Sequence, residues 1–359
     1  MNEHALAGAR GPVTIACAAP FGIGGMGRHL EELVSFCRGR WETRWFATDL
    51  NGGSEGGEMV RVKWAEWLRR IPPVRFSAAW QGYLEAVAFD RAVAKRLSGG
   101  HTFIGFNGQC LASLCSARRL NFKKVIDVAA TPHVNLTVAQ ARIAFAYAPV
   151  EPLGVIRSQQ QRFLREYALA DQIVFATEYV RESFLAEGVS PDKLTRFELS
   201  AHRRFRQKPG ERKRDGKFRI LAVGSLNLVK GTAVLLDAFS RFNLAESELT
   251  LVGGSGSRQM RRFLADRMAR DPRIKIAPGD PLPYLQAADV CVHAAFQDGF
   301  AYAPMEAMAC GVPVIVTEHT GMKEYVRDGV NGFIVPAGNA EAIVEALAKI
   351  GNLRSDTKR

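Results

Sequence analysis

The feature that most constrains the fold is a repeated alternation of short apolar runs and helical patterns along the 359 residues. The runs at 13–17, 172–176 and 218–223 have the length of buried strands, and a helical pattern follows each of them. Strands that alternate with helices in this way are typical of parallel sheets covered on both faces. The sequence therefore predicts an α/β protein with doubly wound sheets.

The remaining elements follow from the same patterns. Further strands are predicted at residues 43–47, 102–106, 123–128, 194–198, 249–252, 274–276, 289–293 and 312–317. Helices are predicted over 28–37, 76–97, 179–187, 232–242 and 339–350. The turn-rich segment 328–335 is interpreted as a hairpin.

A polar, basic stretch at 202–217 interrupts this pattern and contains Pro209, Gly210 and Gly216. Domain boundaries fall in such stretches, and the chain is long enough for two cores. We therefore predict an N-terminal domain over 1–205, a basic linker over 206–216 and a C-terminal domain over 217–359.

Composition narrows the class of protein. Apolar residues make up 47% and charged residues 23%, as in soluble globular proteins. No apolar run approaches the roughly 18 residues that span a bilayer, and the first ten residues lack the apolar core of a signal peptide. The six cysteines form no CxxC pair, so we expect reduced thiols, no metal framework and a cytoplasmic location.

The net charge of +12 favours an anionic partner. The stretch 61–75 places Trp64 and Trp67 among basic residues, so it could lie on an anionic inner membrane face or form a surface helix with inward tryptophans. The basic stretch 202–217 lacks interleaved aromatic residues for base stacking, so no nucleic-acid partner is predicted.

The stretch 296–311, FQDGFAYAPMEAMACG, carries the best candidate site. Pro304 suits the first turn of a helix and Gly311 suits its end, which puts Asp298 on a loop and Glu306 on the helix. The helix N-terminus offers backbone N–H groups to a phosphate, and an acid on the helix can accept bonds from sugar hydroxyls. The stretch predicts a nucleotide-sugar pocket, with a capped surface helix as the alternative.

Two further residues are candidates. Lys230 lies beside Gly231 at a predicted helix start, where its charge could meet phosphate oxygens. His133 follows the strand at 123–128, at the end of a parallel strand where ligands gather. Each could instead be structural or solvent-exposed.

A glycine-rich turn follows the first strand. Gly22, Gly24 and Gly27 match G-x-G-x-x-G, and Asp49 closes the next strand, so a dinucleotide-binding oxidoreductase of the NAD type is an alternative. Such a loop also lets backbone N–H groups approach any diphosphate.

Taken in order, GGMGRH, the loop with His133, GSLNLVKG, DGFAYAPMEAMACGVPVI and GMKEYVRDGVNGF resemble the family-4 glycosyltransferases of the GT-B fold. The resemblance covers about residues 13–350. It implies two Rossmann-like domains facing a central cleft, an N-terminal acceptor-side domain and a C-terminal nucleotide-sugar-binding domain. It also implies hexosyl transfer with retention, without a metal or another cofactor.

The resemblance assigns roles to residues. It implies that Glu306 holds the ribose, that Asp298 contacts the donor sugar and that Lys230 binds the diphosphate. His133 would lie near the reaction centre, which makes His133, Asp298 and Lys230 the catalytic candidates. The other candidates for substrate binding are Gly24, Gly25, Ser225, Gly299, Phe300, Ala301, Tyr302 and Ala303.

Three features depart from the family pattern. Asp298 stands where Glu is usual, and Ser225 stands where an arginine usually meets the diphosphate, which leaves more of the charge to Lys230 and the helix terminus. The chain also stops soon after the helix at 339–350, which indicates either looser domain closure or a sequence that is not complete at this end. A non-catalytic nucleotide-sugar binder or a partner subunit is thus the main alternative. The base, the sugar, the acceptor and the oligomeric state stay open.

Overall fold

The computed structural model describes residue 6 and residues 8–52, 55–62, 78–153, 157–207, 215–244 and 246–356. Trp64, Trp67 and most of the predicted linker lie outside the described residues. The chain divides into two compact units, which we call unit 1 (Met1–Val138 and Gly154–Leu199) and unit 2 (Ala139–Leu153 and Ser200–Arg359).

Two segments of the predicted N-terminal domain, Ala139–Leu153 and residues 200–205, belong to unit 2. Residues 1–205 were expected to form an uninterrupted N-terminal domain, but Ala139–Leu153 packs with unit 2. The helix α5, Val134–Tyr147, therefore begins in unit 1 and ends in unit 2.

Unit 1 is built on a sheet of seven parallel strands in the order β3-β2-β1-β4-β5-β6-β7. The strands are β1 Val13–Ala16, β2 Thr43–Ala47, β3 Gly57–Met59, β4 Thr102–Phe106, β5 Lys124–Ala129, β6 Gln172–Phe175 and β7 Leu194–Arg196. The strand order reverses between β1 and β4, which is where open α/β sheets bind ligands.

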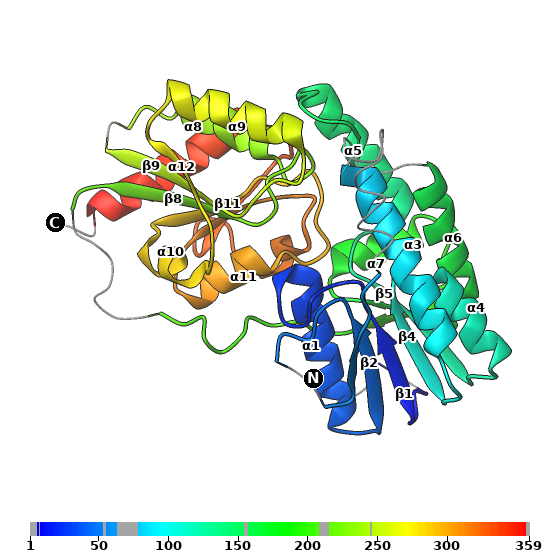
Figure 1. The fold of residues 1–359 in the computed structure, drawn as a ribbon. Coiled ribbons are helices and arrows are strands. Elements are labelled where there is room, and N and C mark those ends of the chain that lie inside the picture. The colour runs from blue at the N-terminus through cyan, green and yellow to red at the C-terminus, as the bar shows by residue number, and fades with distance from the viewer. Residues whose placement is uncertain are drawn as a thin grey trace. The chain divides into compact units, whose positions relative to one another are not determined.

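Helices cover both faces of this sheet. They are α1 Gly24–Arg38, α3 Ala78–Arg96, α4 Leu111–Arg119, α5, α6 Arg157–Leu169, α7 Glu178–Leu185 and the short η2 Pro191–Lys193. Helices α3, α4 and α6 lie together on one face, whereas α1 and α7 lie on the other (Figure 1).

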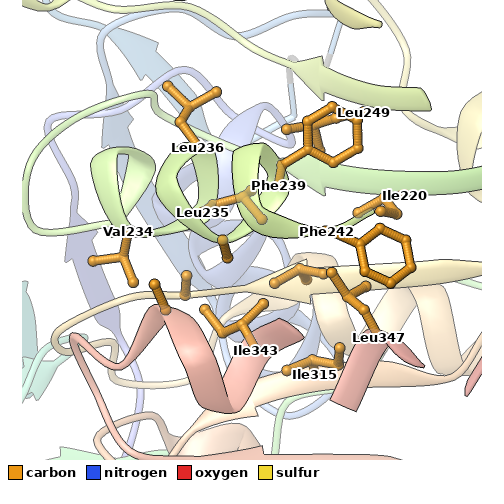
Figure 2. Close-up of a cluster of buried hydrophobic side chains, with 14 of the residues drawn as sticks. Ile220, Val234, Leu235, Leu236, Phe239, Phe242, Leu249, Ile315, Ile343 and Leu347 are labelled. Carbon is orange, nitrogen blue, oxygen red and sulfur yellow. The ribbon is translucent and has the colours of Figure 1, made fainter. Parts of the chain in front are cut away.

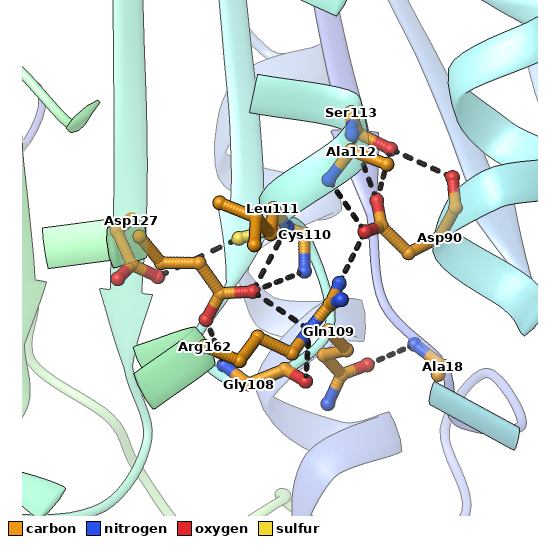
Figure 3. A network of polar contacts seen from close by, with 11 residues as sticks. Ala18, Asp90, Gly108, Gln109, Cys110, Leu111, Ala112, Ser113, Asp127 and Arg162 are labelled. Atoms are coloured by element: carbon orange, nitrogen blue, oxygen red, sulfur yellow. Dashed lines mark hydrogen bonds and ion pairs between the residues drawn. The ribbon is translucent and has the colours of Figure 1, made fainter. Parts of the chain in front are cut away.

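A buried polar network fixes the start of α4 (Figure 3). Glu166 accepts the backbone N–H groups of Cys110 and Leu111 at 2.9 Å each. Asp90 accepts those of the next two residues at 2.6 and 2.8 Å. Arg162 pairs with both carboxylates, all three side chains being at most 8% exposed. The N-terminus of α4 is thus capped by the chain's own acids.

Unit 2 contains six parallel strands in the order β10-β9-β8-β11-β12-β13. They are β8 Phe218–Val223, β9 Ser247–Val252, β10 Ile274–Ala277, β11 Val290–His293, β12 Val314–Thr317 and β13 Gly332–Val335. The strand order reverses between β8 and β11. The predicted hairpin at 328–335 is wrong, because β13 pairs in parallel with β12.

The helices of unit 2 are α8 Thr232–Arg241, α9 Arg258–Arg270, α10 Leu282–Ala287, α11 Tyr302–Ala309, η3 Gly321–Tyr325 and α12 Ala340–Asp356. Helices α8 and α9 cover one face of the sheet, and α10 and α11 cover the other (Figure 1). Figure 2 shows α8 and α12 packing through Val234, Leu235 and Ile343, all at most 3% exposed. Within the described ranges, no helix combines the length and the apolar character needed to cross a membrane.

Candidate functional site

The loop after β8, residues 224–231, carries Lys230 at the point where the strand order of unit 2 reverses. Asn227 accepts the backbone N–H of Lys230 through Oδ1 at 2.9 Å. Gly231 has φ of 69°, and a Cβ at this position would lie 1.8 Å from the carbonyl oxygen of Ala294. Only glycine lets the backbone at position 231 lie this close to Ala294. The loop that carries Lys230 therefore packs against the residues that follow β11.

The loop after β11 carries Asp298 on the other side of the same switch point. The N–H of Phe296 donates to the carbonyl of Val229 at 2.8 Å, so the two loops are bonded directly. Asp298 donates its own N–H to His319 at 3.1 Å and accepts that of Gly321 at 3.0 Å. Both loops are therefore held by backbone bonds at the carboxyl edge of the sheet, where ligands gather.

These loops bring three charged or titratable side chains together. Lys230 Nζ lies 2.5 Å from Oδ2 of Asp298, and His293 Nε2 lies 2.9 Å from the same oxygen. Burial raises the pKa of Asp298, but Lys230 and His293 outweigh it and hold this pKa well below its ordinary value. Asp298 is thus a carboxylate at neutral pH, and the side chain of Lys230 stays 33% exposed.

His293 was missed by the sequence analysis, although it is the last residue of β11. His293 precedes Asp298 by five residues in the sequence, and it is 9% exposed. The only available signal was its position at the end of a buried strand at the switch point. A histidine there is ordinarily structural, and no spacing rule links it to Asp298.

Helix α11 begins beside this cluster. Its N-cap, Ala301, has the left-handed φ of 64°, which turns the chain from the loop into the helix. The backbone N–H groups of Tyr302 and Ala303 stand in the first turn of the helix, where the i→i−4 bonding pattern has not yet begun. The rings of Phe300 and Tyr302 pack edge to face with centroids 5.0 Å apart.

The other predicted residues of unit 2 differ in their exposure. Glu306, on α11, is 0% exposed, so the residue predicted to bind the ribose is enclosed by protein. Gly299 is also buried, whereas Ser225 is exposed on the loop of Lys230. In the part of the chain that the structure describes, no three His, Cys, Asp or Glu side chains are grouped so as to hold a metal ion.

His133, Gly24 and Gly25 lie in unit 1. The two glycines open α1 and are exposed. His133 is 3% exposed, with its ring 5.0 Å from that of Tyr167 and 5.1 Å from that of Phe184. Burial lowers the pKa of His133, so its ring is neutral at pH 7.

Comparison with known proteins gives a family match for the second part of the chain. Residues 203–359 match the family described as "Glycosyl transferases group 1". A curated relative, the amylovoran biosynthesis glycosyltransferase AmsK of Erwinia amylovora, is 29% identical over 151 residues, which cover 39% of this chain and 37% of the relative. The chain spans 37%, 43% and 38% of the length of the first three curated relatives.

Solved structures share the fold over nearly the whole chain. Sucrose-phosphate synthase from Thermosynechococcus elongatus matches with a TM-score of 0.69 and 19% identity, covering 95% of this chain and 89% of that one. HepE of Anabaena, solved in complex with UDP-glucose, matches with a TM-score of 0.67 and 16% identity, covering 96% and 90%.

The chain thus shares the GT-B fold of these structures, which confirms the predicted α/β fold with two Rossmann-like units. Residues 203–359, less than half of the chain, match the glycosyl transferases group 1, in agreement with the resemblance at the level of the group. The narrower assignment to family 4 stays a prediction.

Proposed function

We propose that the protein is a glycosyltransferase that moves a sugar from a nucleotide-diphosphate sugar to an acceptor hydroxyl. The observation that carries this proposal is the pairing of Lys230 with Asp298 across the switch point of the unit that matches the family. A cation and a carboxylate at this edge offer one group for a diphosphate and one for sugar hydroxyls. The oxidoreductase alternative gives no role to this second unit.

Each residue then has a distinct task. Lys230 and the first N–H groups of α11, at Ala301 to Ala303, bind the diphosphate. Asp298 accepts hydrogen bonds from the sugar, and Glu306 accepts those of the ribose once the ligand reaches its enclosed carboxylate. Ser225 offers a hydroxyl to the diphosphate, and Gly299 with Phe300 shapes the approach to the helix.

Charge stabilisation is the main catalytic contribution we propose. When the bond between the anomeric carbon and the diphosphate oxygen breaks, the electron pair leaves with the diphosphate. A fixed cation and helix N–H groups at the departing oxygens lower the barrier most, because they act where charge develops. We propose that transfer retains the anomeric configuration and uses no metal ion or other cofactor, with His133, Gly24 and Gly25 contributing from unit 1.

The first test replaces the cation. Lys230→Ala should lower the release of nucleoside diphosphate from the donor by about 100-fold or more, as removal of one charge-stabilising group does. The matched control is Lys275→Ala, which also removes a lysine paired with a carboxylate in unit 2, that of Glu248 at 3.1 Å. This control should retain the activity of the unaltered protein.

Donor and acceptor are found by screening. Melting temperatures measured with UDP-, GDP- and ADP-sugars identify the donor, because a ligand that binds the folded state raises the melting temperature.

Near-normal turnover of Lys230→Ala would exclude the proposed donor site at Lys230. Donor binding without diphosphate release, across an acceptor panel that includes saccharides and lipid-linked glycans, would instead favour the non-catalytic binder or partner subunit.

A further inference from the structure

The segment Ala139–Leu153 precedes the rest of unit 2 in the chain but forms part of its core. Ala144 is fully buried in the hydrophobic cluster of unit 2, and Tyr147, Ala148 and Val150 pack against that cluster. The segment contains the C-terminal part of α5 and the residues that follow it. The unit that carries Lys230 and Asp298 is therefore completed by a piece of the first half of the chain.

Glu151 connects this segment to the loop of Lys230. Its Oε1 accepts the backbone N–H of Leu228 at 2.7 Å, across 77 residues of sequence. Glu151 is 9% exposed and Leu228 is 4% exposed, so solvent does not readily replace this acceptor. Leu228 stands two residues before Lys230, on the loop that Gly231 presses against the end of β11.

Tyr147 connects the same segment to the loop of Asp298. Its ring centroid lies 6.1 Å from that of Phe296, which is 1% exposed and stands two residues before Asp298. The hydroxyl of Tyr147 donates to Oδ2 of Asp237 at 2.9 Å, while Arg267 donates to the other oxygen of Asp237 at 2.6 Å. The hydrogen bond of its hydroxyl thus fixes the ring of Tyr147, which packs against Phe296.

We propose that Ala139–Leu153 is a positioning element of the donor site. Glu151 sets the loop of Lys230 and Tyr147 sets the loop of Asp298, and the bond between Phe296 and Val229 links the two loops. Neither residue touches the reacting atoms in this proposal. It rests on the proposed function, because it assigns the segment a role in binding the donor.

The test compares truncation with conservative replacement. Glu151→Ala removes the acceptor for Leu228, whereas Glu151→Gln keeps an oxygen there. Tyr147→Ala removes the ring, whereas Tyr147→Phe removes only the hydroxyl. The control is Glu345→Ala, which removes an exposed glutamate from α12 of the same unit. Two measurements are made on the full chain: the Kd for UDP, GDP and ADP by calorimetry, and amide hydrogen exchange at Leu228 and Phe296.

We expect Glu151→Ala to speed exchange at Leu228 by about tenfold or more, because the buried amide loses its side-chain acceptor. The Kd for the nucleotide should rise by about the same factor, with Glu151→Gln close to the unaltered protein. Tyr147→Ala should speed exchange at Phe296 and weaken nucleotide binding, whereas Tyr147→Phe should weaken it less.

The proposal is overturned if Glu151→Ala and Tyr147→Ala match Glu345→Ala in both measurements. It is also overturned if exchange rises while the Kd stays unchanged, because the segment would then be merely structural. Should Glu151→Ala fail to fold, the pair Tyr147→Ala and Tyr147→Phe decides by the same readouts. If no nucleotide binds the unaltered protein, the proposed function fails, and the exchange data still show separately whether Glu151 and Tyr147 hold the two loops.

Discussion

A single carboxylate oxygen, Oδ2 of Asp298, is shared by the ammonium of Lys230 and Nε2 of His293. The cation proposed to bind the diphosphate is thus paired with a carboxylate in this structure. A diphosphate carries more negative charge than one carboxylate, so it can draw Lys230 away from Asp298. His293 and the backbone bonds of Asp298 would then keep the carboxylate in place for the sugar.

The pH dependence of activity tests this role of His293. Because Lys230 and His293 depress the pKa of Asp298 against its burial, His293→Phe should raise this pKa. The carboxylate then protonates at a higher pH. We expect the acid limb of kcat/KM for the donor to move up by about one pH unit.

The same substitution changes stability with a defined sign. A carboxyl whose folded pKa is depressed stabilises the fold above its unfolded pKa and loses this contribution as the pH falls through the folded pKa. In His293→Phe the loss should occur at a higher pH, as followed by acid titration of circular dichroism. If His293→Phe and the unaltered protein show the same pH dependence of kcat/KM and of unfolding, His293 does not hold Asp298.

At the residue scale, the sequence indicated Lys230 and Asp298 but neither His293 nor Glu151. The first two stand in recognisable motifs, beside a glycine turn and before a helix start. The role of Glu151 depends on a contact with Leu228 across 77 residues, which no local pattern encodes. The left-handed backbone conformation of Ala301 could not be predicted either, because alanine normally avoids that conformation.

At the scale of elements, the site depends on how closely two loops approach. Gly231 and Gly329 have nearly equal positive φ, 69° and 73°. A Cβ on Gly231 would collide with the carbonyl oxygen of Ala294, whereas a Cβ on Gly329 would meet nothing within 4 Å. The two positions therefore separate backbone strain from loss of space.

We expect Gly329→Ala to lower the free energy of unfolding by about 1 kcal/mol, from the left-handed conformation alone. Gly231→Ala should lower it by about 2 to 4 kcal/mol, because the loop must also move away from Ala294. It should weaken nucleotide binding as well, since Lys230 is the adjacent residue. Urea titrations and nucleotide calorimetry measure both effects, and equal losses of stability would refute the close approach as the cause.

Element boundaries were predictable where glycine or a loop bounds a buried run. The strand β8 was predicted as Phe218–Val223, between Gly216 and Gly224, and the structure confirms these bounds. The edge strand β3, Gly57–Met59, has no apolar run and was not predicted. The hairpin error at 328–335 arose because turn residues indicate a reversal of the chain, whereas the partner of β13 is set by the sheet.

At the scale of the whole molecule, the two units have separate cores, yet they are not separate in sequence. Helix α5 is continuous from Val134 to Tyr147, although its two ends belong to different units. Val134 packs in a cluster of unit 1 and Ala144 in the core of unit 2. Periodicity reports which side of a helix is apolar, but not which core receives it.

Because the two units have separate cores, a substitution that destabilises one unit should speed amide exchange mainly in that unit. In unit 1, Arg162 pairs with two buried acids, Asp90 and Glu166. Burial raises the pKa of Glu166 to about 7, against the lowering by Arg162 and by backbone N–H groups. Arg162→Leu leaves both acids buried without their cation, and loss of one partner of such a pair destabilises a fold by about 3 to 5 kcal/mol.

We therefore expect amide exchange in β4 to quicken strongly in Arg162→Leu, while exchange in β9 stays closer to that of the unaltered protein. Without the cation the pKa of Glu166 rises further, because Arg162 no longer lowers it. Stability lost at pH 7 should then return in part as the pH falls and Glu166 protonates, because a carboxyl with a raised folded pKa favours the fold at lower pH. Arg118→Leu, which removes a more exposed pair with Asp171, is the matched control and should change β4 little. Equal quickening of exchange in β4 and β9 would instead show that the two units open together, with α5 joining them into one cooperative structure.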